Sequence, residues 1–474
     1  MSVGKINVTS TLRRAERLLQ EDKSASPALR AIVEVLITVI QLLVQKLGAN
    51  STNSSLPPSQ DPHRRRGSKR KGSARKRRPG GQPGHEGATL QPDPHPDQIE
   101  TIAIDRRTIP PGRYRPAGYE ARQVIDIEIH KHVTEYRAAI LEDAQGRQFV
   151  ASFPDGVTRP VQYGPGVKVQ AVYMSQWQLL PYERIGDYFA DQCGLPLSPG
   201  SVFNFNQEAF GLLERFEAIV VQQLIHQDVL HADETGINLN GKLGWLHNLS
   251  NAEWTLFFVH ERRGAEAMLA MGVLPHFHGT LCHDHWKAYF QFNCLHSLCN
   301  AHHLRELKRA EEEGQRWAPR MHALLLDINE ATKRSGGCLS ERRAERFRLR
   351  YHSILDAAER ECPPPAQKDN GKRGPIARSK ARNLLERLRL YETETLRFMT
   401  DPKVPFTNNR GENDLRMTKV QQKISGCFRS WEGARIFCRV RSYLSTCRKH
   451  HLGATDALKL LFSGHLPDFI PKAE

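Results

Sequence analysis

The sequence has no cysteine before Cys193, and its nine cysteines include no CxxC pair. Paired thiols at that spacing are typical of zinc and redox sites, so no site of either kind built on a cysteine pair is expected. No secretory signal is recognised at the N-terminus, and we expect no targeting peptide. The cysteines are therefore expected to be reduced thiols in a cytoplasmic protein.

Long hydrophobic runs are also lacking. The apolar run at 31–47 is shorter than the ~20 residues that cross a bilayer, and Glu34 interrupts it, so no membrane partner is expected. An a/d heptad seam from Leu29 to Leu47 predicts that segment 1–50 forms a short coiled coil and a homo-oligomer. An amphipathic helix packed on its own domain is the alternative. The seam residues are Leu29, Val33, Leu36, Ile40, Leu43 and Leu47.

Acidic residues are too few to balance the basic ones. The chain has 68 Lys and Arg against 52 Asp and Glu, a net charge of +16, which predicts a polyanionic partner. Many of the basic residues lie in 51–98, a Pro/Gly-rich linker arm with a basic run at 64–78. Such an arm binds phosphates without reading bases. The candidate phosphate contacts are Arg64, Arg65, Arg66, Lys69, Arg70, Lys71, Arg75, Lys76, Arg77 and Arg78.

The next two segments differ in pattern. Residues 99–158 alternate between apolar and polar side chains, which predicts a small β-rich module. Residues 159–224 are expected to be helical, with the turn LPLSPG between two helices. This pair is either a helix-turn-helix that enters a DNA major groove or a plain helical hairpin.

A sheet is expected after residue 225. The apolar run IHQDVL predicts a strand that delivers Asp233 at its end, and Asn240-Gly241 predicts a hairpin into a three-stranded meander. GTLCHDHW predicts a fourth strand ending at Asp284, and HSLCNAHHLREL predicts a fifth strand leading into a helix. An aspartate on the central strand of a meander is typical of a ribonuclease-H-like α/β core, whose first and fourth strands lie side by side.

The remaining chain alternates between core and other segments, so the fold class is a multidomain α+β protein. Charged helical patterns broken by PPP and NGKRGP predict a helical insertion within the core. We place the first part of the core at 225–309, the insertion at 310–400, the remainder of the core at 401–448 and a C-terminal tail at 449–474.

Three acids, Asp233, Asp284 and Glu412, are candidates for a metal site. Glu412 opens a helix that Thr407 or Asn408 could cap, and Asp414 should point about 200° away from it. Carboxylates hold Mg²⁺ or Mn²⁺, and two such ions can activate the attacking oxygen and stabilise the leaving one in phosphodiester cleavage. Arginines of a helix expected at 432–448 should bring positive charge near this site: Arg435, Arg439 and Arg441.

Over nearly its whole length the sequence resembles the insertion-sequence-66 family of bacterial transposases, which have a DDE catalytic core. The resemblance rests on NSSLPPSQD, RRPGGQPGHEG, HADETG, LCHDHWKAYF, HSLCNAHHLREL and VPFTNNRGENDLRMTKVQQKISGCFRS. It implies that Asp233, Asp284 and Glu412 are the acidic triad and that a helical insertion precedes the glutamate. It also implies cutting of transposon ends and attack of the freed 3′-hydroxyl on target DNA. The element's own helper proteins are further candidate partners.

The same sequence blocks contain candidate supporting residues: Cys299, His302, Arg305, Asn408, Asn409 and Arg416. Cys299-x-x-His302 resembles a CxxH feature of several DDE transposase groups. Two ligands do not make a zinc site by themselves, so a role in packing is favoured over a metal. Relatives commonly carry a zinc module built on paired cysteines after PGGQPGH, but residues 99–158 contain no cysteine. No zinc is therefore expected there.

Two other functions explain parts of the sequence. A catalytically decayed DNA-binding protein would explain the charge and the helices, but not three acids at positions compatible with the fold. A ribonuclease-H-like nuclease or Holliday-junction resolvase would explain the acids. It would leave the insertion and the N-terminal segment without a role. A transposase accounts for all of these features.

Neutralising Arg75, Lys76, Arg77 and Arg78 should flatten the salt dependence of DNA binding. Each lost phosphate contact should reduce the slope of log K against log salt by about 0.9. Fluorescence anisotropy over a range of salt concentrations measures this slope on an end-containing duplex and on a scrambled one. The change should be equal for both duplexes. An unchanged slope would show that the arm is only a solvated linker.

Overall fold

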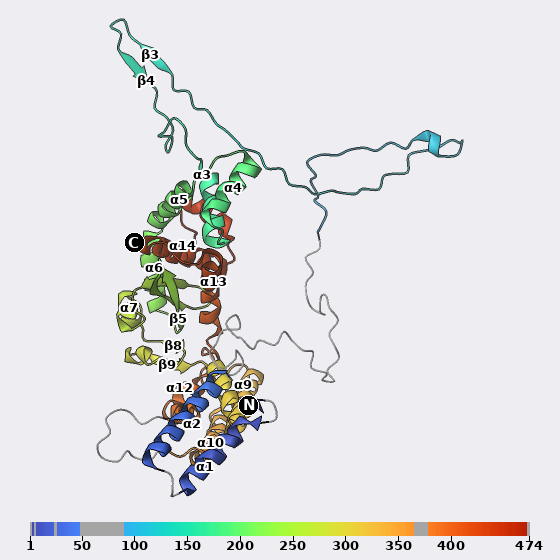
Figure 1. Cartoon of the computed structure of the whole chain (residues 1–474). Coiled ribbons are helices and arrows are strands. Elements are labelled where there is room, and N and C mark those ends of the chain that lie inside the picture. Colours follow the sequence, from blue (N-terminus) through green and yellow to red (C-terminus); the bar gives the residue numbers. More distant parts are fainter. Residues whose placement is uncertain (1, 4–5, 23–25, 48–89, 365–377, 472–474) are drawn as a thin grey trace.

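The computed structural model describes residues 2–3, 6–22, 26–47, 90–364 and 378–471. In this part of the chain the architecture is mixed α+β, with fifteen α-helices, one five-stranded mixed sheet and two short two-stranded sheets (Figure 1). The basic run at 64–78, with all ten candidate phosphate contacts, lies outside the described residues. None of the described helices is both long and apolar enough to cross a membrane.

The N-terminal segment contains two helices, α1 (Val8–Glu21) and α2 (Pro27–Leu47), preceded by the short strands β1 (Ser2–Val3) and β2 (Ile6–Asn7). The two helices contact each other, and Gln41 of α2 donates to Glu16 of α1 at 2.6 Å. Ile37 is buried, but four residues of the heptad seam are 39–54% exposed: Leu29, Leu36, Ile40 and Leu43. A broad apolar face of α2 is therefore open.

Residues 99–158 are mostly extended chain, apart from one short 3₁₀ turn and one hairpin. The hairpin joins β3 (Ile140–Glu142) to β4 (Gln148–Val150). The alternating stretch 121–139 is not a strand, and its apolar side chains, such as Val124, are exposed. An alternating pattern favours an extended backbone, but a strand also needs a neighbour that completes its hydrogen bonds. The sequence pattern therefore overpredicts strands in this segment.

The central sheet has the order β7-β6-β5-β8-β9. Its strands are β5 (Val229–Leu239), β6 (Lys242–Ser250), β7 (Thr255–His260), β8 (Thr280–His283) and β9 (Leu295–Leu298). The first three form an antiparallel meander, whereas β8 and β9 run parallel to β5.

The five predicted strands are confirmed, with one correction. Asn240 and Gly241 have φ of +47° and +83°, as a two-residue turn between twisted antiparallel strands requires. β5 continues without a break as far as this turn, so Asp233 lies in the interior of a long strand and not at the end of a short one. The strand is long because β6 pairs with it along nine consecutive positions, from His231 to Leu239.

Helices cover both faces of the sheet. Successive residues of β5 point to opposite faces. Leu230 and Ala232 belong to an apolar core shared with α6 (Glu214–Ile225), whereas Ile237 and Leu239 belong to a core shared with α13 (Asn409–Ser425). The predicted short helix α7 (Ala265–Ala270) follows β7, and α14 (Trp431–Lys449) packs along β7.

The helical region before the sheet is part of the apolar core. It contains α3 (Pro165–Val172), the π-helical turn Tyr173–Trp177, α4 (Tyr182–Cys193) and α5 (Pro199–Leu212). α4 ends at Gly194 in the left-handed conformation, and Ser198 caps α5 through the backbone N–H of Ser201. α5 packs against α3 and α14 and contains no Lys or Arg. The two helices form a hairpin that packs into the apolar core, and whether they contact DNA stays a prediction.

The segment 449–474, expected to be a tail, contributes to the core instead. It contains α15 (Ala454–Phe462), in which Ala457, Leu458 and Leu461 are buried. The hydroxyl of Tyr443 in α14 donates to the carbonyl of Ala457 at 2.8 Å. The three- and four-residue spacings of these apolar side chains are a short amphipathic pattern that the sequence reading overlooked.

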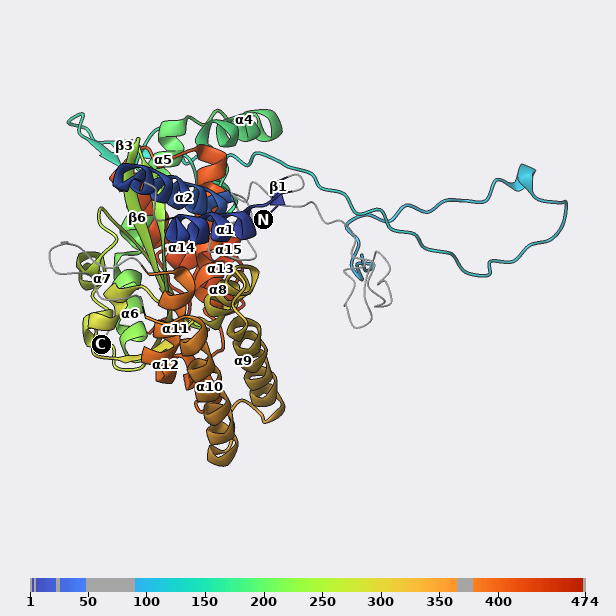
Figure 2. The ribbon, with the colours of Figure 1, turned by 60° about the horizontal axis from the view of Figure 1, so that its bottom comes forward.

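The described parts of the predicted insertion, 310–364 and 378–400, are mostly helical and form an apolar core together with α8. The helices are α8 (Asn300–Glu312), α9 (Trp317–Arg334), α10 (Glu341–Glu361), α11 (Lys380–Leu390) and α12 (Glu392–Leu396). Trp317 and Tyr351 are fully buried in this core. Arg387 of α11 binds Glu306 of α8 through two hydrogen bonds of 2.8 and 2.9 Å. Figure 2 shows α9 and α10 extending away from the rest of the molecule.

Replacing both Leu36 and Leu43 with Asp should convert an oligomer into a smaller species, because two charges would enter an apolar interface. Multi-angle light scattering at matched concentrations measures the mass. The control is Thr38→Asp, which adds a charge to the same helix outside the seam and should leave the mass unchanged. If the double variant keeps the parental mass, the exposed face of α2 does not mediate self-association.

Candidate active site

Asp233 and Asp284 lie on neighbouring parallel strands. β5 and β8 pair as far as His231 opposite Cys282. The same register continued by two residues places Asp233 beside Asp284, which directly follows β8. The backbone N–H of Trp286 donates to Asp284 Oδ1 at 2.9 Å and holds this carboxylate at the end of the strand.

Glu412 lies in the first turn of α13, within electrostatic range of Asp233. This helix contacts β5 and β6 and covers the face of β5 that carries Asp233. Burial raises the pKa of Asp233 well above its usual range, and the charges of Glu234, Asp284 and Glu412 raise it further. These carboxylates are thus close enough to repel one another. Acids held together in this way favour the binding of a cation.

Two buried histidines beside the acids are neutral. Burial lowers the pKa of His231 to about 4 and that of His283 to about 3. The ring of His283 shares a hydrogen bond with His296, from Nε2 to Nδ1 at 3.1 Å. Neither buried imidazole supplies positive charge at neutral pH, so the repulsion among the carboxylates is not relieved by them.

Asn408, at the N-terminus of α13, attaches this helix to β5. His231 donates through Nδ1 to its Oδ1 at 2.7 Å, and its Nδ2 donates to the carbonyl of Ala232 at 2.7 Å. Its backbone N–H donates to Cys299 Sγ at 3.1 Å. Asn408 occupies the N-cap position, but its side chain does not cap the helix as the sequence suggested, because it is engaged by the strand. A Cβ on Gly411 would lie 3.2 Å from Asn408 Nδ2, so glycine leaves room for this side chain.

The C-terminal end of α13 is attached to the same strand. After the helix, the backbone of Phe428 donates to the carbonyl of Asn238 at 2.8 Å and accepts from Asn240 at 2.9 Å. Lys419 Nζ donates to the carbonyl of Gly236 at 3.0 Å. Hydrogen bonds from both ends of α13 to β5 therefore fix where the first turn places Glu412.

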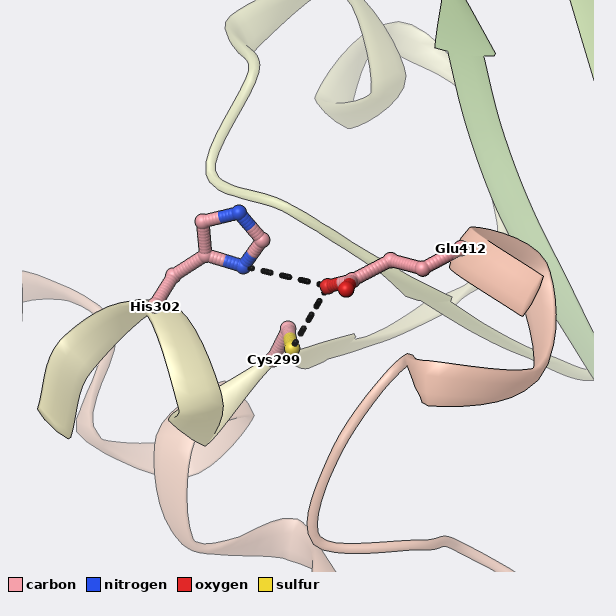
Figure 3. A group of neighbouring side chains, drawn as sticks. All are labelled: Cys299, His302 and Glu412. Carbon is pink, nitrogen blue, oxygen red and sulfur yellow. Dashed lines mark hydrogen bonds and ion pairs between the residues drawn. The ribbon is translucent and has the colours of Figure 1, made fainter. Parts of the chain in front are cut away.

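The carboxylate of Glu412 points toward α8 (Figure 3). Its Oε1 lies 4.0 Å from Cys299 Sγ, 3.8 Å from His302 Nδ1 and 3.6 Å from Arg305 Nη2. Cys299 and His302 come from the residue before α8 and its first turn, so the CxxH pair lies beside the third acid. Three of the expected supporting residues thus surround Glu412.

Asp414 is directed elsewhere, as the helical spacing predicted. It forms an ion pair of 3.0 Å with Lys449 of α14, and both side chains are largely buried. The ammonium of Lys449 also donates to the carbonyls of Asn251 and Trp254. Asp414 therefore holds α13 to α14 and lies away from the acids.

Glu234 is a prominent site residue that the sequence analysis missed. Its side chain is 1% exposed and pairs with Arg263 at 2.5 Å, and it also accepts a hydrogen bond from the hydroxyl of Tyr289. The guanidinium of Arg263 lies over the rings of Trp245 and Trp286. An acid directly after Asp233 points to the opposite face of the strand. The signal in the sequence was an acid that shares a strand face with the apolar residues Leu230 and Ala232, since a buried acid needs a partner.

Two expected contributors from α14 lie away from the acids. Arg439 pairs with Glu217, and Arg441 donates to the carbonyls of Gln176 and Trp177, so the expectation that both bring charge to the site is wrong. These arginines lie on the side of α14 that faces the helical region before the sheet. Three others are exposed to solvent: Arg435, Asn409 and Arg416.

Comparisons with known families agree with the sequence motifs. Residues 160–436 match a family model described as Transposase IS66 family, and this match spans more than half of the chain and contains all three candidate acids. Residues 8–91 match a second model, described as a family of unknown function (DUF6444). A search of curated proteins finds no match.

Replacing Asn408 with Ala should destabilise the protein by roughly 1–3 kcal/mol, since it leaves His231 with a buried, unpaired donor. Urea unfolding followed by fluorescence measures the midpoint. The control is Asn409→Ala, a change of the same chemistry at an exposed position one residue later, which should alter the midpoint little. Equal midpoints for both variants would mean that the hydrogen bonds of Asn408 do not hold α13 on the strand.

Proposed function

The chain belongs to the transposase IS66 family, and on that premise we propose that it cuts phosphodiester bonds at the ends of an insertion sequence and joins the freed 3′-hydroxyl to target DNA. The observation that carries this proposal is the cluster of Asp233, Asp284 and Glu412, which two adjacent parallel strands and one helix bring together. The proposed partners are DNA, further copies of the chain and helper proteins of the same element. The proposed place of action is the cytoplasm.

The sheet supports a ribonuclease-H-like core. Three antiparallel strands followed by two parallel ones, with the first strand central, match the arrangement expected from the sequence. In this proposal the core is formed by residues 225–309 and 401–448, and residues 310–400 are inserted into it. The basic arm at 64–78 holds DNA by its phosphates.

The donor set fits Mg²⁺ or Mn²⁺. Asp233, Asp284 and Glu412 would hold two such ions, because hard cations prefer carboxylate oxygens and these acids repel one another without a cation. When bound, the ions activate the attacking oxygen and stabilise the leaving one. Glu234 is not assigned as a ligand, since it points to the other face of β5 and is paired with Arg263.

The protein's own residues position the reaction. The paired strands hold the two aspartates in a fixed register, and Asn408 holds the helix that carries the glutamate. Lys419 lies on the strand-facing side of α13 within electrostatic range of Asp233, where it can bind a DNA phosphate beside the acids. Charge on this ammonium would offset the phosphate that enters a site already lined by carboxylates.

Replacing Asp233, Asp284 or Glu412 with Ala should lower the rate of Mg²⁺-dependent nicking of an end-containing duplex by more than about 100-fold. Loss of residues that only support metal ligands already costs 10–100-fold. Binding to the same duplex, measured by gel shift, should persist because it depends on other parts of the chain. Joined products with a target duplex distinguish a transposase from a nuclease.

The matched control is Asp414→Asn, an acid two residues from Glu412 on the same helix. It should retain nicking, although its unfolding midpoint should fall because Lys449 loses a buried partner. If Glu412→Ala cuts normally while Asp414→Asn is inactive, the assignment of the third acid is wrong. If all four variants cut like the parent, this cluster is not the catalytic site.

A further inference from the structure

A second set of metal-binding atoms lies beside the acid cluster. Cys299 Sγ, His302 Nδ1 and a carboxylate oxygen of Glu412 all lie within 4.8 Å of one another (Figure 3). The cysteine directly precedes α8, the histidine lies in its first turn, and the glutamate comes from α13. Two separate helices therefore direct one thiol, one imidazole and one carboxylate at a common point.

The spacing of these atoms is close to that of a tetrahedral zinc site. Bonds of about 2.3 Å to sulfur and 2.0–2.2 Å to nitrogen and oxygen separate neighbouring ligand atoms by about 3.4–3.6 Å. Glu412 Oε1 lies 4.0 Å from the sulfur and 3.8 Å from the nitrogen. A rotation of the glutamate side chain that shortens both separations by about half an ångström would bring them to those values. The sulfur and the nitrogen lie within 4.8 Å of each other, and a small movement of Cys299 or His302 would bring this pair together as well.

Two features show that the ligands are available and oriented. His302 Nδ1 is buried and has no hydrogen-bond partner among the described residues, which is costly unless something binds it. The sulfur of Cys299 accepts a hydrogen bond from the backbone N–H of Asn408, the residue that fixes α13. Such a contact orients a metal ligand from outside the coordination sphere.

The chemistry of the donors selects the metal. Thiolate and imidazole favour Zn²⁺ and similar ions, whereas Mg²⁺ favours oxygen ligands. Arg305 opposes a cation here, because its guanidinium lies 3.6 Å from Glu412 Oε1. One carboxylate and one thiolate supply two negative charges, which match a divalent ion. The thiol proton is released to solvent as the metal–sulfur bond forms.

We propose that Cys299, His302 and Glu412 form a site for a thiophilic divalent cation such as Zn²⁺, which shares Glu412 with the acid cluster. An ion bound there takes the third acid away from Asp233 and Asp284. On the proposed function, Zn²⁺ is then an inhibitor of Mg²⁺-dependent cleavage. The binding site itself does not depend on that function.

Titration of the purified full-length protein with Co²⁺ tests the site, because a thiolate bound to Co²⁺ gives a charge-transfer absorption band in the near ultraviolet. The parent should show this band at one Co²⁺ per chain, and Zn²⁺ should abolish it. Cys299→Ala should lose the band, whereas Cys438→Ala, which changes another buried cysteine, should keep it. A band that persists without Cys299, or no band at all in the parent, would overturn the proposal.

Two further variants test the geometry. His302→Ala should weaken Co²⁺ binding at least tenfold, and Arg305→Gln should strengthen it, since the opposing charge is gone. Asp233→Ala should keep the band, because Asp233 is not a ligand, although it should lose nicking. If the parent protein shows the band but never nicks DNA, the metal site is supported and the proposed function is refuted. Zn²⁺ should inhibit nicking by the parent more strongly than nicking by Cys299→Ala. Equal inhibition of the two proteins would overturn the shared use of Glu412.

Discussion

The position of α13 on β5 is the constraint on which the acid cluster depends. Two of the acids belong to a single sheet, whose backbone pairing fixes their spacing. Glu412, the third, is separated from them by a long helical insertion, so chain connectivity alone does not bring it near them. Asn408 supplies the connection: its side chain accepts a hydrogen bond from His231 and donates one to the carbonyl of Ala232, the residue before Asp233. The buried side-chain amide of Asn408, whose oxygen accepts one hydrogen bond and whose nitrogen donates another, thus joins two distant parts of the chain.

Much of the sheet could be predicted because its signals are local. Alternating side chains and an Asn-Gly turn are readable within about ten residues. Local signals also explain the errors. Alternation in 121–139 indicated extended chain but could not show that no strand among the described residues pairs with it. The buried helix α15 was missed because a short apolar pattern near an end resembles a tail until its packing partner, α14, is known.

The candidate site was predictable as a list of residues but not as a set of contacts. Asp233, Asp284 and Glu412 followed from their places on expected strands and a helix. The sequence could not reveal that Glu412 completes a group with Cys299 and His302, since that contact spans 113 residues. Nor could it show that the arginines of α14 turn toward the helical region before the sheet. Side-chain direction in a buried helix depends on every element packed around it, and such packing is a property of the whole fold.

The separation of 177 positions between His231 and Asn408 also bears on the order of events during synthesis. Domains tend to form as they leave the ribosome, and contacts between distant segments wait for the later one. A nascent chain that ends after the helical insertion already contains the entire sheet and both aspartates. It contains neither the glutamate nor the asparagine that positions it. The acid cluster is therefore completed late in translation, long after the basic run at 64–78 has been synthesised. On the proposed function, a partly made chain binds nucleic acid before it is able to cut it.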